Sequence, residues 1–324
     1  MKKNTILFSV SAAVFFLCSV PLFSDDTTAA ISSYLEDTTK NLSGDIVENT
    51  TQLNVSPDAY IGKFLPSVPP HFSVGLSVSG TLIDTGDISN AVNSVIADMQ
   101  SAGSIDFSIP DSLVLPTYSV NARIGGFFLP FDIGVFGSFA SAQDLKYADF
   151  SAAVSELTFG ADVRYALLEG NVILPKISIG LGYIYTRQSF DFSVAKSYTG
   201  TYESYTGTIN SSASMGLKFN MNILYLQAQI SKKLLVFVPY AGVRAVLVST
   251  DNSYKYSSTV KADTTYTDGT SGNVSSHGFD FAELQPQIFA GVGFNVLFTQ
   301  FTVNACWNPR SNLWSASLSS VFRM

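Results

Sequence analysis

The sequence predicts an all-β protein: a transmembrane antiparallel β-barrel of about ten strands, preceded by a signal peptide and a short N-terminal leader. Three observations support this fold class. Apolar and small polar residues alternate in ten segments, and the connections between the segments alternate between short and long. The chain is also apolar, with a mean hydropathy of +0.25 and 13% charged residues, yet it shows no second long apolar run. A barrel in lipid explains this combination, because its apolar surface is spread over many short strands.

The first 24 residues have the order of a secretory signal peptide. Lys2 and Lys3 are followed by a mostly apolar stretch and then by the small residue Ser24. We expect cleavage after Ser24, with a retained anchor or a lipoprotein modified at Cys18 as the alternatives. Loss of the two lysines takes the formal charge from -7 to -9, which argues against a nucleic-acid partner. Cys306 is then the one remaining cysteine, so no intramolecular disulfide is expected.

Residues 25–70 are polar and poor in aromatic residues. The stretch from Ala29 to Leu42 has the spacing of a weak helix, with Ile31, Leu35 and Leu42 on one side. We expect a periplasmic leader here, and the alternative is a plug folded into the barrel.

Residues 71–324 carry the alternation that predicts one barrel. In the first segment Phe72, Val74, Leu76 and Val78 alternate with small polar residues or glycine. The ten segments are 72–82, 118–128, 132–139, 156–167, 176–186, 215–230, 240–247, 287–296, 301–307 and 314–322. In the sixth, the apolar parity changes near Asn220–Asn222, which suggests a β-bulge.

The connections predict the orientation of the barrel. Four are tight, at residues 128–130, 168–171, 231–233 and 297–299. Four are long and polar, at residues 84–117, 140–152, 189–205 and 249–276. Bacterial barrels place short turns in the periplasm and long loops outside, so the tight side is predicted to be periplasmic. The stretch 87–99 has helical spacing and is expected to cap the outer mouth or to pack on its rim.

Together with these segments, the C-terminal stretch 314–324 resembles the bacterial outer-membrane β-barrel proteins as a class, including porin-like proteins. The resemblance covers roughly residues 70–324 and is architectural. It implies an outer-membrane location in contact with lipid. It also implies that the barrel-assembly machinery reads the final strand at the aromatic residue Phe322, although Arg323 and Met324 follow it here.

If the apolar parity faces lipid, the other parity fills the lumen. Its charged members are the candidate lumen-lining residues: Arg123, Asp132, Glu156, Asp162, Arg164, Lys176, Lys218 and Arg244. Buried charges need partners, so these side chains either pair with each other and close a narrow barrel or line a water-filled path. Ten strands lie close to the size at which side chains fill the interior.

The expected function is a small outer-membrane channel or transporter for polar or amphipathic small molecules. The alternative is a closed barrel that acts as a surface adhesin or structural protein, binding an extracellular ligand through its long outer loops. We expect no enzyme, because His71 and His277 are the two histidines and only His277 has a nearby acid, Asp280. No motif for a metal or cofactor appears, so none is expected.

Overall fold

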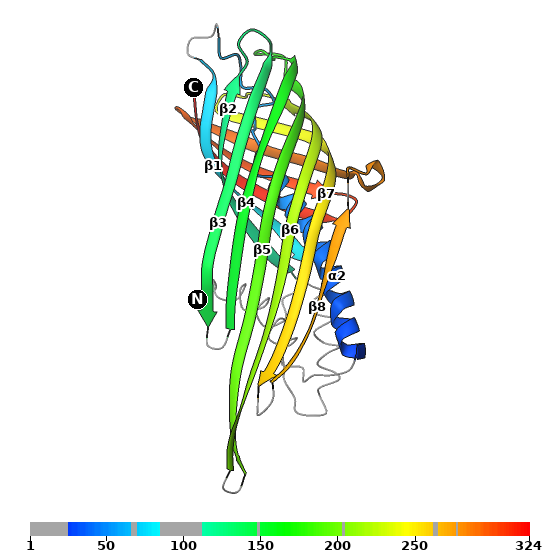
Figure 1. The fold of residues 1–324 in the computed structure, drawn as a ribbon. Coiled ribbons are helices and arrows are strands. Elements are labelled where there is room, and N and C mark those ends of the chain that lie inside the picture. The colour runs from blue at the N-terminus through cyan, green and yellow to red at the C-terminus, as the bar shows by residue number, and fades with distance from the viewer. Residues whose placement is uncertain are drawn as a thin grey trace.

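The computed structural model describes residues 25–65, 70–84, 112–147, 150–202, 205–261, 265–276 and 278–324, and it shows a β-barrel (Figure 1). The predicted signal peptide, residues 1–24, lies outside these described residues. The strands are β1 Phe72–Asp84, β2 Ser112–Gly125, β3 Phe131–Tyr147, β4 Phe150–Leu168, β5 Lys176–Tyr202, β6 Tyr205–Ser231, β7 Phe237–Lys261, β8 Thr265–Ser276, β9 Gln285–Val296, β10 Thr299–Asn308 and β11 Leu313–Arg323.

Antiparallel pairing closes ten of these strands into a barrel. The order runs β6-β5-β4-β3-β2-β1-β11-β10-β9-β7, and pairing of β6 with β7 completes the circle. The remaining strand, β8, pairs with the outer part of β7, from Thr250 to Lys261, whereas β9 pairs with the inner part, from Phe237 to Val246. The predicted barrel of about ten strands is therefore confirmed, and β8 is an addition beyond its wall.

Short turns gather at one end of the barrel, as predicted. The turns before β3, β5, β7 and β10 lie there, and so do both ends of the barrel chain, where Met324 N donates to Phe72 O at 3.0 Å. We call this the inner end; it is the end that the sequence prediction places in the periplasm. Gly170 and Leu235 have positive φ in two of these turns, which suits glycine at the first and is unusual for leucine at the second.

The expectation of long outer loops is wrong in three places. Residues 140–152, 189–205 and 249–276 mostly continue the strands, and the β5–β6 ladder runs outward to Tyr202↔Tyr205. These stretches are rich in serine, threonine and tyrosine, and the last two favour extended backbone, so pairing continues where lipid contact no longer requires an apolar face. Of the fourth predicted loop, residues 85–111 lie outside the described residues, and with them the expected helix at 87–99.

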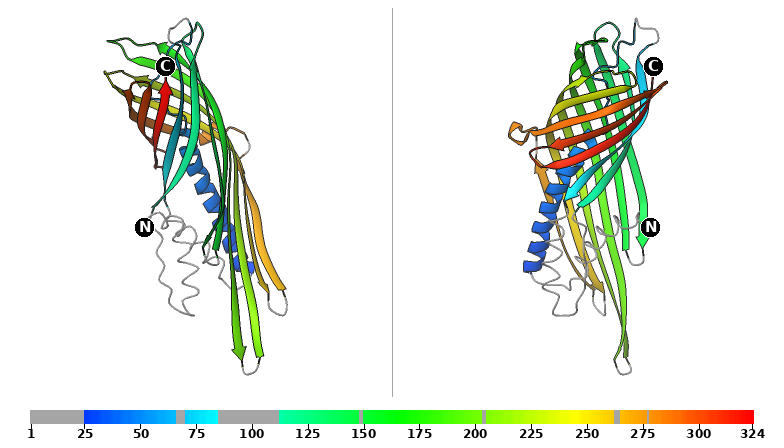
Figure 2. Two further views of the ribbon diagram at one scale, coloured as in Figure 1. Left: turned by 90° about the vertical axis from the view of Figure 1, so that its left-hand side faces the viewer. Right: turned by 180° about the vertical axis from the view of Figure 1, so that it is seen from behind.

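The wall of the barrel is consequently tall on one side and short on the other (Figure 2). Strands β5 and β6 have 27 residues each and β7 has 25, whereas β10 has 10 and β11 has 11. At roughly 3.3 Å per residue, the longer strands exceed what a tilted strand needs to cross a bilayer. The taller wall, β5 to β8, therefore projects outward beyond the lipid.

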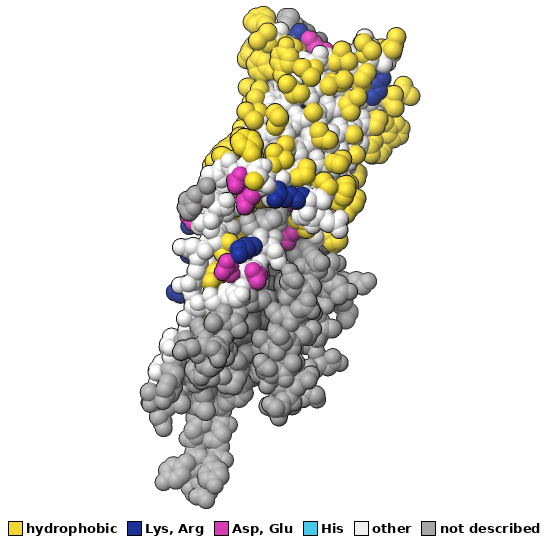
Figure 3. Space-filling view, turned by 90° about the vertical axis from the view of Figure 1, so that its right-hand side faces the viewer, with side chains coloured by type: hydrophobic (Ala, Val, Ile, Leu, Met, Phe, Trp, Pro, Cys, Tyr) yellow, Lys and Arg dark blue, Asp and Glu magenta, His cyan; other side chains and the backbone are white. Residues whose placement is uncertain are grey.

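A band of exposed apolar side chains surrounds the inner part of the barrel (Figure 3). Leu76, Val120 and Phe159 are among its members, and each is more than half exposed. Such a surface is unfavourable in water and favourable in hydrocarbon, and strand pairing around a barrel satisfies most of the backbone groups there. The protein is thus an outer-membrane β-barrel. Among the described residues, no helix has the length and apolar character needed to span a membrane.

No bulge occurs in β6, contrary to the expectation from its change of apolar parity. Its register with β5 is unbroken through Asn220–Asn222. Met215, Leu217 and Phe219 face inward with Tyr225, whereas Leu226 and Ile230 face lipid. Both faces of this strand are apolar because a helix in the lumen packs its apolar face against the inner one, as described next.

Candidate functional site

The lumen is occupied by the N-terminal segment of the chain. Helix α2, Asp25–Thr51, runs along the inside of the tall wall, and residues 52–61 continue it to the inner end (Figures 1 and 2). Ser32 lies at the outer end, where its hydroxyl is 2.9 Å from that of Tyr254. At the inner end, Ile61 N donates to Asp132 at 3.1 Å. In the structure this segment occupies the lumen as a plug, which was the alternative to a periplasmic leader for residues 25–70.

The outer part of the plug, residues 25–47, is held mainly by apolar packing. Leu35, Thr39, Leu42 and Ile46 recur at intervals of three and four residues, so they share one helix face. Leu35 and Ile46 are completely buried against a cluster on the wall. That cluster includes Met215, Leu217, Phe219, Met221, Ile223, Tyr225, Tyr254 and Tyr256. The inward apolar face of β6 is therefore the docking surface for this helix.

The inner part of the plug, residues 48–61, is held by polar contacts instead. These residues form hydrogen bonds or ion pairs with all ten strands of the barrel. The wall partners are Ser79, Thr117, Ser119, Arg123, Asp132, Asp162, Arg164, Lys176, Gln229, Ser231, Arg244, Gln287, Gln300, Asn304, Ser315 and Arg323. Residues 52–61, which follow the helix, can lie in the lumen without forming a helix or strand because the wall satisfies their polar groups.

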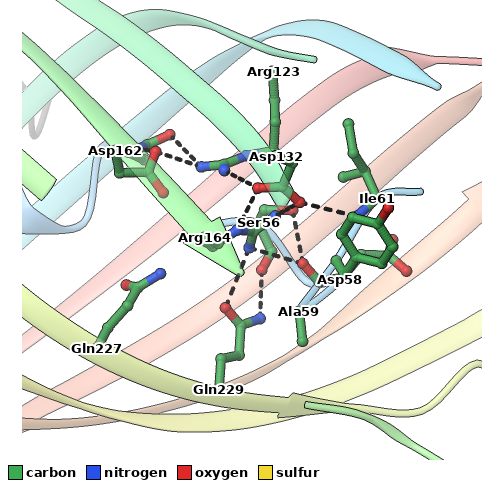
Figure 4. Close-up of polar contacts among 12 residues, drawn as sticks. Ser56, Asp58, Ala59, Ile61, Arg123, Asp132, Asp162, Arg164, Gln227 and Gln229 are labelled. Atoms are coloured by element: carbon green, nitrogen blue, oxygen red, sulfur yellow. Dashed lines mark hydrogen bonds and ion pairs between the residues drawn. The ribbon is translucent and has the colours of Figure 1, made fainter. Parts of the chain in front are cut away.

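Four of the predicted lumen residues form one buried cluster beside the plug (Figure 4). Arg164 forms a two-pronged contact with Asp132, at 2.8 Å from Nε and 2.9 Å from Nη2. Arg123 bridges Asp132 and Asp162 at 2.6 and 2.7 Å. Two cations thus face two carboxylates, and the cluster is neutral. The first of the two interpretations, mutual pairing in a narrow lumen, describes these residues.

The plug adds contacts to this cluster from its own side. Asn54 donates to Asp162 at 2.6 Å, and Arg164 Nη1 donates to the carbonyl of Asp58 at 2.9 Å. Because unpaired groups here would be costly to desolvate, the plug and the wall satisfy each other's polar atoms. Gly134 makes room for the cluster, since a Cβ there would collide with both Arg123 and Asp162.

Asp58 is the second charged centre of the inner plug. Its carboxylate accepts from Lys176 at 3.3 Å and Gln300 at 3.1 Å, and it pairs with Arg323. Burial alone would raise the pKa of this carboxyl, but the two cations outweigh burial and hold the pKa well below its usual range. Asp58 is therefore ionised at neutral pH and joins the plug to β5, β10 and β11.

Arg244 lies apart from both centres. Its guanidinium donates to the carbonyl of Thr51 and to Gln287, each at 3.0 Å, between the rings of Tyr225 and Phe289. Gln287 in turn donates to Glu48 of the plug at 2.8 Å. A cation stacked between two aromatic faces is favourable in a dry environment. This arrangement joins the polar and apolar parts of the plug.

The remaining predicted lumen residues are distributed differently. Glu156 is buried in the lumen wall, 3.3 Å from the hydroxyl of Thr158. Lys218 was predicted to face the lumen, but it is exposed on the outside of β6. The cause is the apolar parity of β6, which the sequence analysis assigned to lipid before Asn220. Leu217 and Phe219 instead face the helix, so Lys218 points away from the lumen.

Several functional residues were missed by the sequence interpretation. Glu48, Asn54 and Asp58 lie in the segment that was taken as a leader, and Arg323 was interpreted as a departure from the usual barrel ending. The spacing of Leu35, Leu42 and Ile46 was the available signal for a buried helix. Nothing local in the sequence pairs Asp58 with its partners, which lie more than 100 residues away.

A cavity of about 240 Å³ lies at the inner end, beside Asp58. It is lined by residues of the plug and by His71, Arg123, Lys176, Lys233 and Arg323. Gly62 has a φ of 118° at this point, and any side chain on it would collide with His71. His277 lies outside the described residues, and no metal-binding cluster occurs among the described ones.

A sequence profile described as Lsa36-like matches residues 26–323. The chain belongs to the Lsa36-like family. The match includes the plug as well as the barrel, so the two form one unit of sequence. A comparison with curated protein sequences finds no match.

Solved structures resemble this chain only distantly. The translocator domain of the autotransporter NalP from Neisseria meningitidis has a TM-score of 0.34 and 8% identity, over 92% of this chain and 98% of that one. A major outer membrane protein from Thermus thermophilus has a TM-score of 0.31 and 11% identity, over 78% and 99%. LpxR from Salmonella typhimurium has a TM-score of 0.30 and 6% identity, over 77% of this chain and 99% of that one. Scores this low indicate nothing about function.

Proposed function

We propose that the protein is a gated outer-membrane transporter for amphipathic small molecules, closed at rest by its own N-terminal plug. One observation carries the proposal: the plug is held by non-covalent contacts alone, inside a lumen whose two halves differ chemically. The outer half presents Met215, Leu217 and Phe219, and the inner half presents paired charges. A plain water channel has no use for an apolar wall.

The resting state is closed because the plug fills the lumen where it is described. Opening requires the plug to leave, which exposes the apolar wall and the paired charges together. A molecule with an apolar part and a polar part can contact both halves. Such a molecule gains from burial on one side and hydrogen bonds on the other, and a purely polar solute does not.

The gate can be tested with a disulfide that locks the plug. Asn49 and Ser79 are suited to this because their side chains already meet, at 2.6 Å from Ser79 Oγ to Asn49 Oδ1. We expect an Asn49→Cys/Ser79→Cys variant, in a Cys306→Ala background, to be silent in planar bilayers when oxidised. Reduction combined with Asp58→Asn should produce steady openings. Silence from reduced protein that is folded and inserted would contradict the gate.

The solute class is tested in cells that produce the same variant. The probe is N-phenyl-1-naphthylamine, a fluorophore with apolar ring systems and one amine group, which an intact outer membrane excludes. We expect its uptake to rise on reduction of the locked variant that also carries Asp58→Asn and to stay unchanged in similarly treated cells with unmodified protein. Equal uptake by oxidised and reduced cells would exclude transport of this class of molecule.

A second candidate function is binding of an extracellular ligand. The observation that favours it is the outward projection of β7 and β8, whose residues 250–261 and 265–276 pair beyond the barrel wall. Serine, threonine and tyrosine dominate this hairpin and offer adaptable hydrogen bonds. Replacing residues 251–275 by a short turn should abolish such binding while the barrel still shows heat-modifiable gel mobility. Unchanged binding to matrix or host material would place the contact elsewhere.

A further inference from the structure

The ladder between β2 and β3 is much shorter than its neighbours. It contains six residue pairs and ends outward at Val120↔Gly137. By contrast, β2 continues for its whole length against β1 with 13 pairs, and β3 pairs with β4 through 15. In the part of the chain that the structure describes, the pairing of β2 with β3 therefore ends here. We call this the β2–β3 seam; it begins at Ser119 and Ser138, the next positions in register.

The seam lies at membrane depth. Leu82 of β1 is directly opposite Trp314 on one side and Val114 of β2 on the other. Tryptophan marks the water–lipid boundary in barrels of this type, so β2 from Val114 to Ser119 lies on the lipid side of that boundary. Among the described residues, the facing edges of β2 and β3 have no strand partner beyond Val120 and Gly137, and a backbone group left unpaired in hydrocarbon costs several kcal/mol.

The lipid side of the seam is an apolar groove of about 800 Å³. Tyr118, Val120 and Phe139 form its rim, and they are 65%, 58% and 79% exposed. Leu157 and Phe159 of β4 extend it. Aromatic and aliphatic side chains in this arrangement suit a hydrocarbon chain.

The lumen side of the seam presents a carboxylate that has no cation partner among the described side chains. Glu156 is opposite Ala140, three positions beyond the end of the β2–β3 ladder, and its side chain is 8% exposed. Hydroxyl groups of Thr158 and Ser138 are its hydrogen-bond donors. The other buried carboxylates of the barrel wall, Asp132 and Asp162, pair with arginine. Since a buried carboxylate favours a positive partner, this site is suited to an ammonium group.

The plug closes the seam from inside. Asn49 donates to the hydroxyl of Thr117 at 2.7 Å, and Ser119 donates to the carbonyl of Leu53 at 3.3 Å. Both wall residues belong to the separated part of β2. Departure of the plug would therefore join the groove, the carboxylate and the lumen.

We propose that the β2–β3 seam is a lateral portal that binds an amphipathic amine. The apolar chain occupies the groove beside Tyr118 and Phe139, and the ammonium group meets Glu156. The portal role rests on the proposed transport function and supplies its solute class, whereas the amine site stands on the seam itself.

A cross-linking experiment tests the seam. Thr117 and Ala140 would be paired if the ladder continued, and Thr117 is paired with Ser79 on its other side. In a Cys306→Ala background, in lipid vesicles, a Ser79→Cys/Thr117→Cys variant should form its disulfide readily. Thr117→Cys/Ala140→Cys should form it at least tenfold more slowly under the same oxidant. Equal rates would show a closed wall and overturn the proposal.

A binding experiment tests the ligand class. A nitroxide-labelled alkylamine is added to the whole protein in vesicles, beside a nitroxide-labelled fatty acid of equal length. We expect an immobilised component in the electron paramagnetic resonance spectrum for the amine alone. Glu156→Gln should weaken its binding about tenfold. Glu169→Gln, an exposed carboxylate in an inner turn, is the control that leaves binding unchanged.

The outcomes separate the portal from the transport function. Equal immobilisation of amine and fatty acid, or no effect of Glu156→Gln, overturns the amine site even if the gated conductance is found. An amine site on an open seam, together with a bilayer that stays silent after plug release, overturns transport and leaves a lipid-side binding site.

Discussion

The two halves of the plug are held in one lumen by different forces. The outer half, residues 25–47, packs Leu35 and Ile46 against an apolar wall. The inner half, residues 48–61, is tied to all ten strands by charges and hydrogen bonds, with Asp58 at its centre. Apolar packing is non-directional and tolerates sliding, whereas a charged network has one geometry. The inner half therefore fixes the register of the plug, and the outer half supplies affinity.

The two halves also differ in what their release exposes. Release of the inner half leaves Asp58, Lys176 and Arg323 to be hydrated, and a cavity already lies beside them at the inner end of the barrel. Release of the outer half exposes apolar surface, which water does not favour. We infer that a molecule with an apolar part assists the second step by replacing the helix on the wall.

The largest expected effect comes from breaking the inner network. Arg164→Ala leaves Asp132 without its two-pronged partner and frees the carbonyl of Asp58. Removal of one member of a buried ion pair typically destabilises a protein by about 3–5 kcal/mol. Unfolding in urea, followed by heat-modifiable gel mobility in vesicles, measures the change. Arg187→Ala, at an exposed position on β5, is the control and should have almost no effect. Equal effects of the two variants would mean that the network does not stabilise the barrel.

A core deletion in the outer half should affect the plug and spare the barrel. Leu35→Ala removes a completely buried side chain. Such a change typically costs about 2–5 kcal/mol of stability. The loss falls on helix docking, because Leu35 belongs to no strand. A cysteine placed at the exposed Ser33 should then react faster with a maleimide that cannot cross membranes, added to intact cells. Unfolding of the barrel at the same urea concentration as wild type is the second half of the expectation.

The same contrast explains what the sequence could reveal. The barrel strands follow from local alternation, since Val74 and Leu76 face lipid and Ser73 and Ser77 face the lumen, as predicted. In β6 both parities are apolar, and alternation cannot distinguish lipid from a helix inside the lumen. Arg123, Asp132, Asp162 and Arg164 were placed inside correctly, but their contacts with the plug join distant residues that no local pattern relates.

The polarity of residues 48–61 suggested a solvated leader for a physical reason. A segment that binds a polar lumen has the composition of a solvated leader, because its partners replace water. Asn49 and Gln52 are completely or almost completely buried, although their residue types favour the surface. The role of Phe322 in assembly stays a prediction.

A smaller effect is expected at the charged centre of the inner half. Asp58→Asn keeps the shape but removes the charge that faces Lys176 and Arg323, and about 2 kcal/mol of plug docking should be lost at neutral pH. The pKa of Asp58 is lowered in the folded protein, so its contribution is present above the unfolded value, near 4, and disappears as the pH falls below it. Docking of the plug in wild type should weaken as the pH falls below about 4, whereas docking in the variant should depend less on pH. Protease sensitivity of the plug across pH measures both. A variant as acid-sensitive as wild type would assign the effect to another carboxyl.

The smallest effect is expected where a charge pair lies on the solvated side of the outer half. Lys40 and Glu36 are one helical turn apart, at 2.7 Å, and both are about half exposed. Water and salt screen this pair, and both long side chains lose freedom when they form it. Glu36→Gln should leave helix docking and gel mobility within experimental error, even though its ion pair is as short as those of the inner network. A measurable loss of docking, reported by faster reaction of a cysteine at Ser33, would show that charge also holds the outer half. The plug could then no longer be divided into an outer part held by apolar packing and an inner part held by charges.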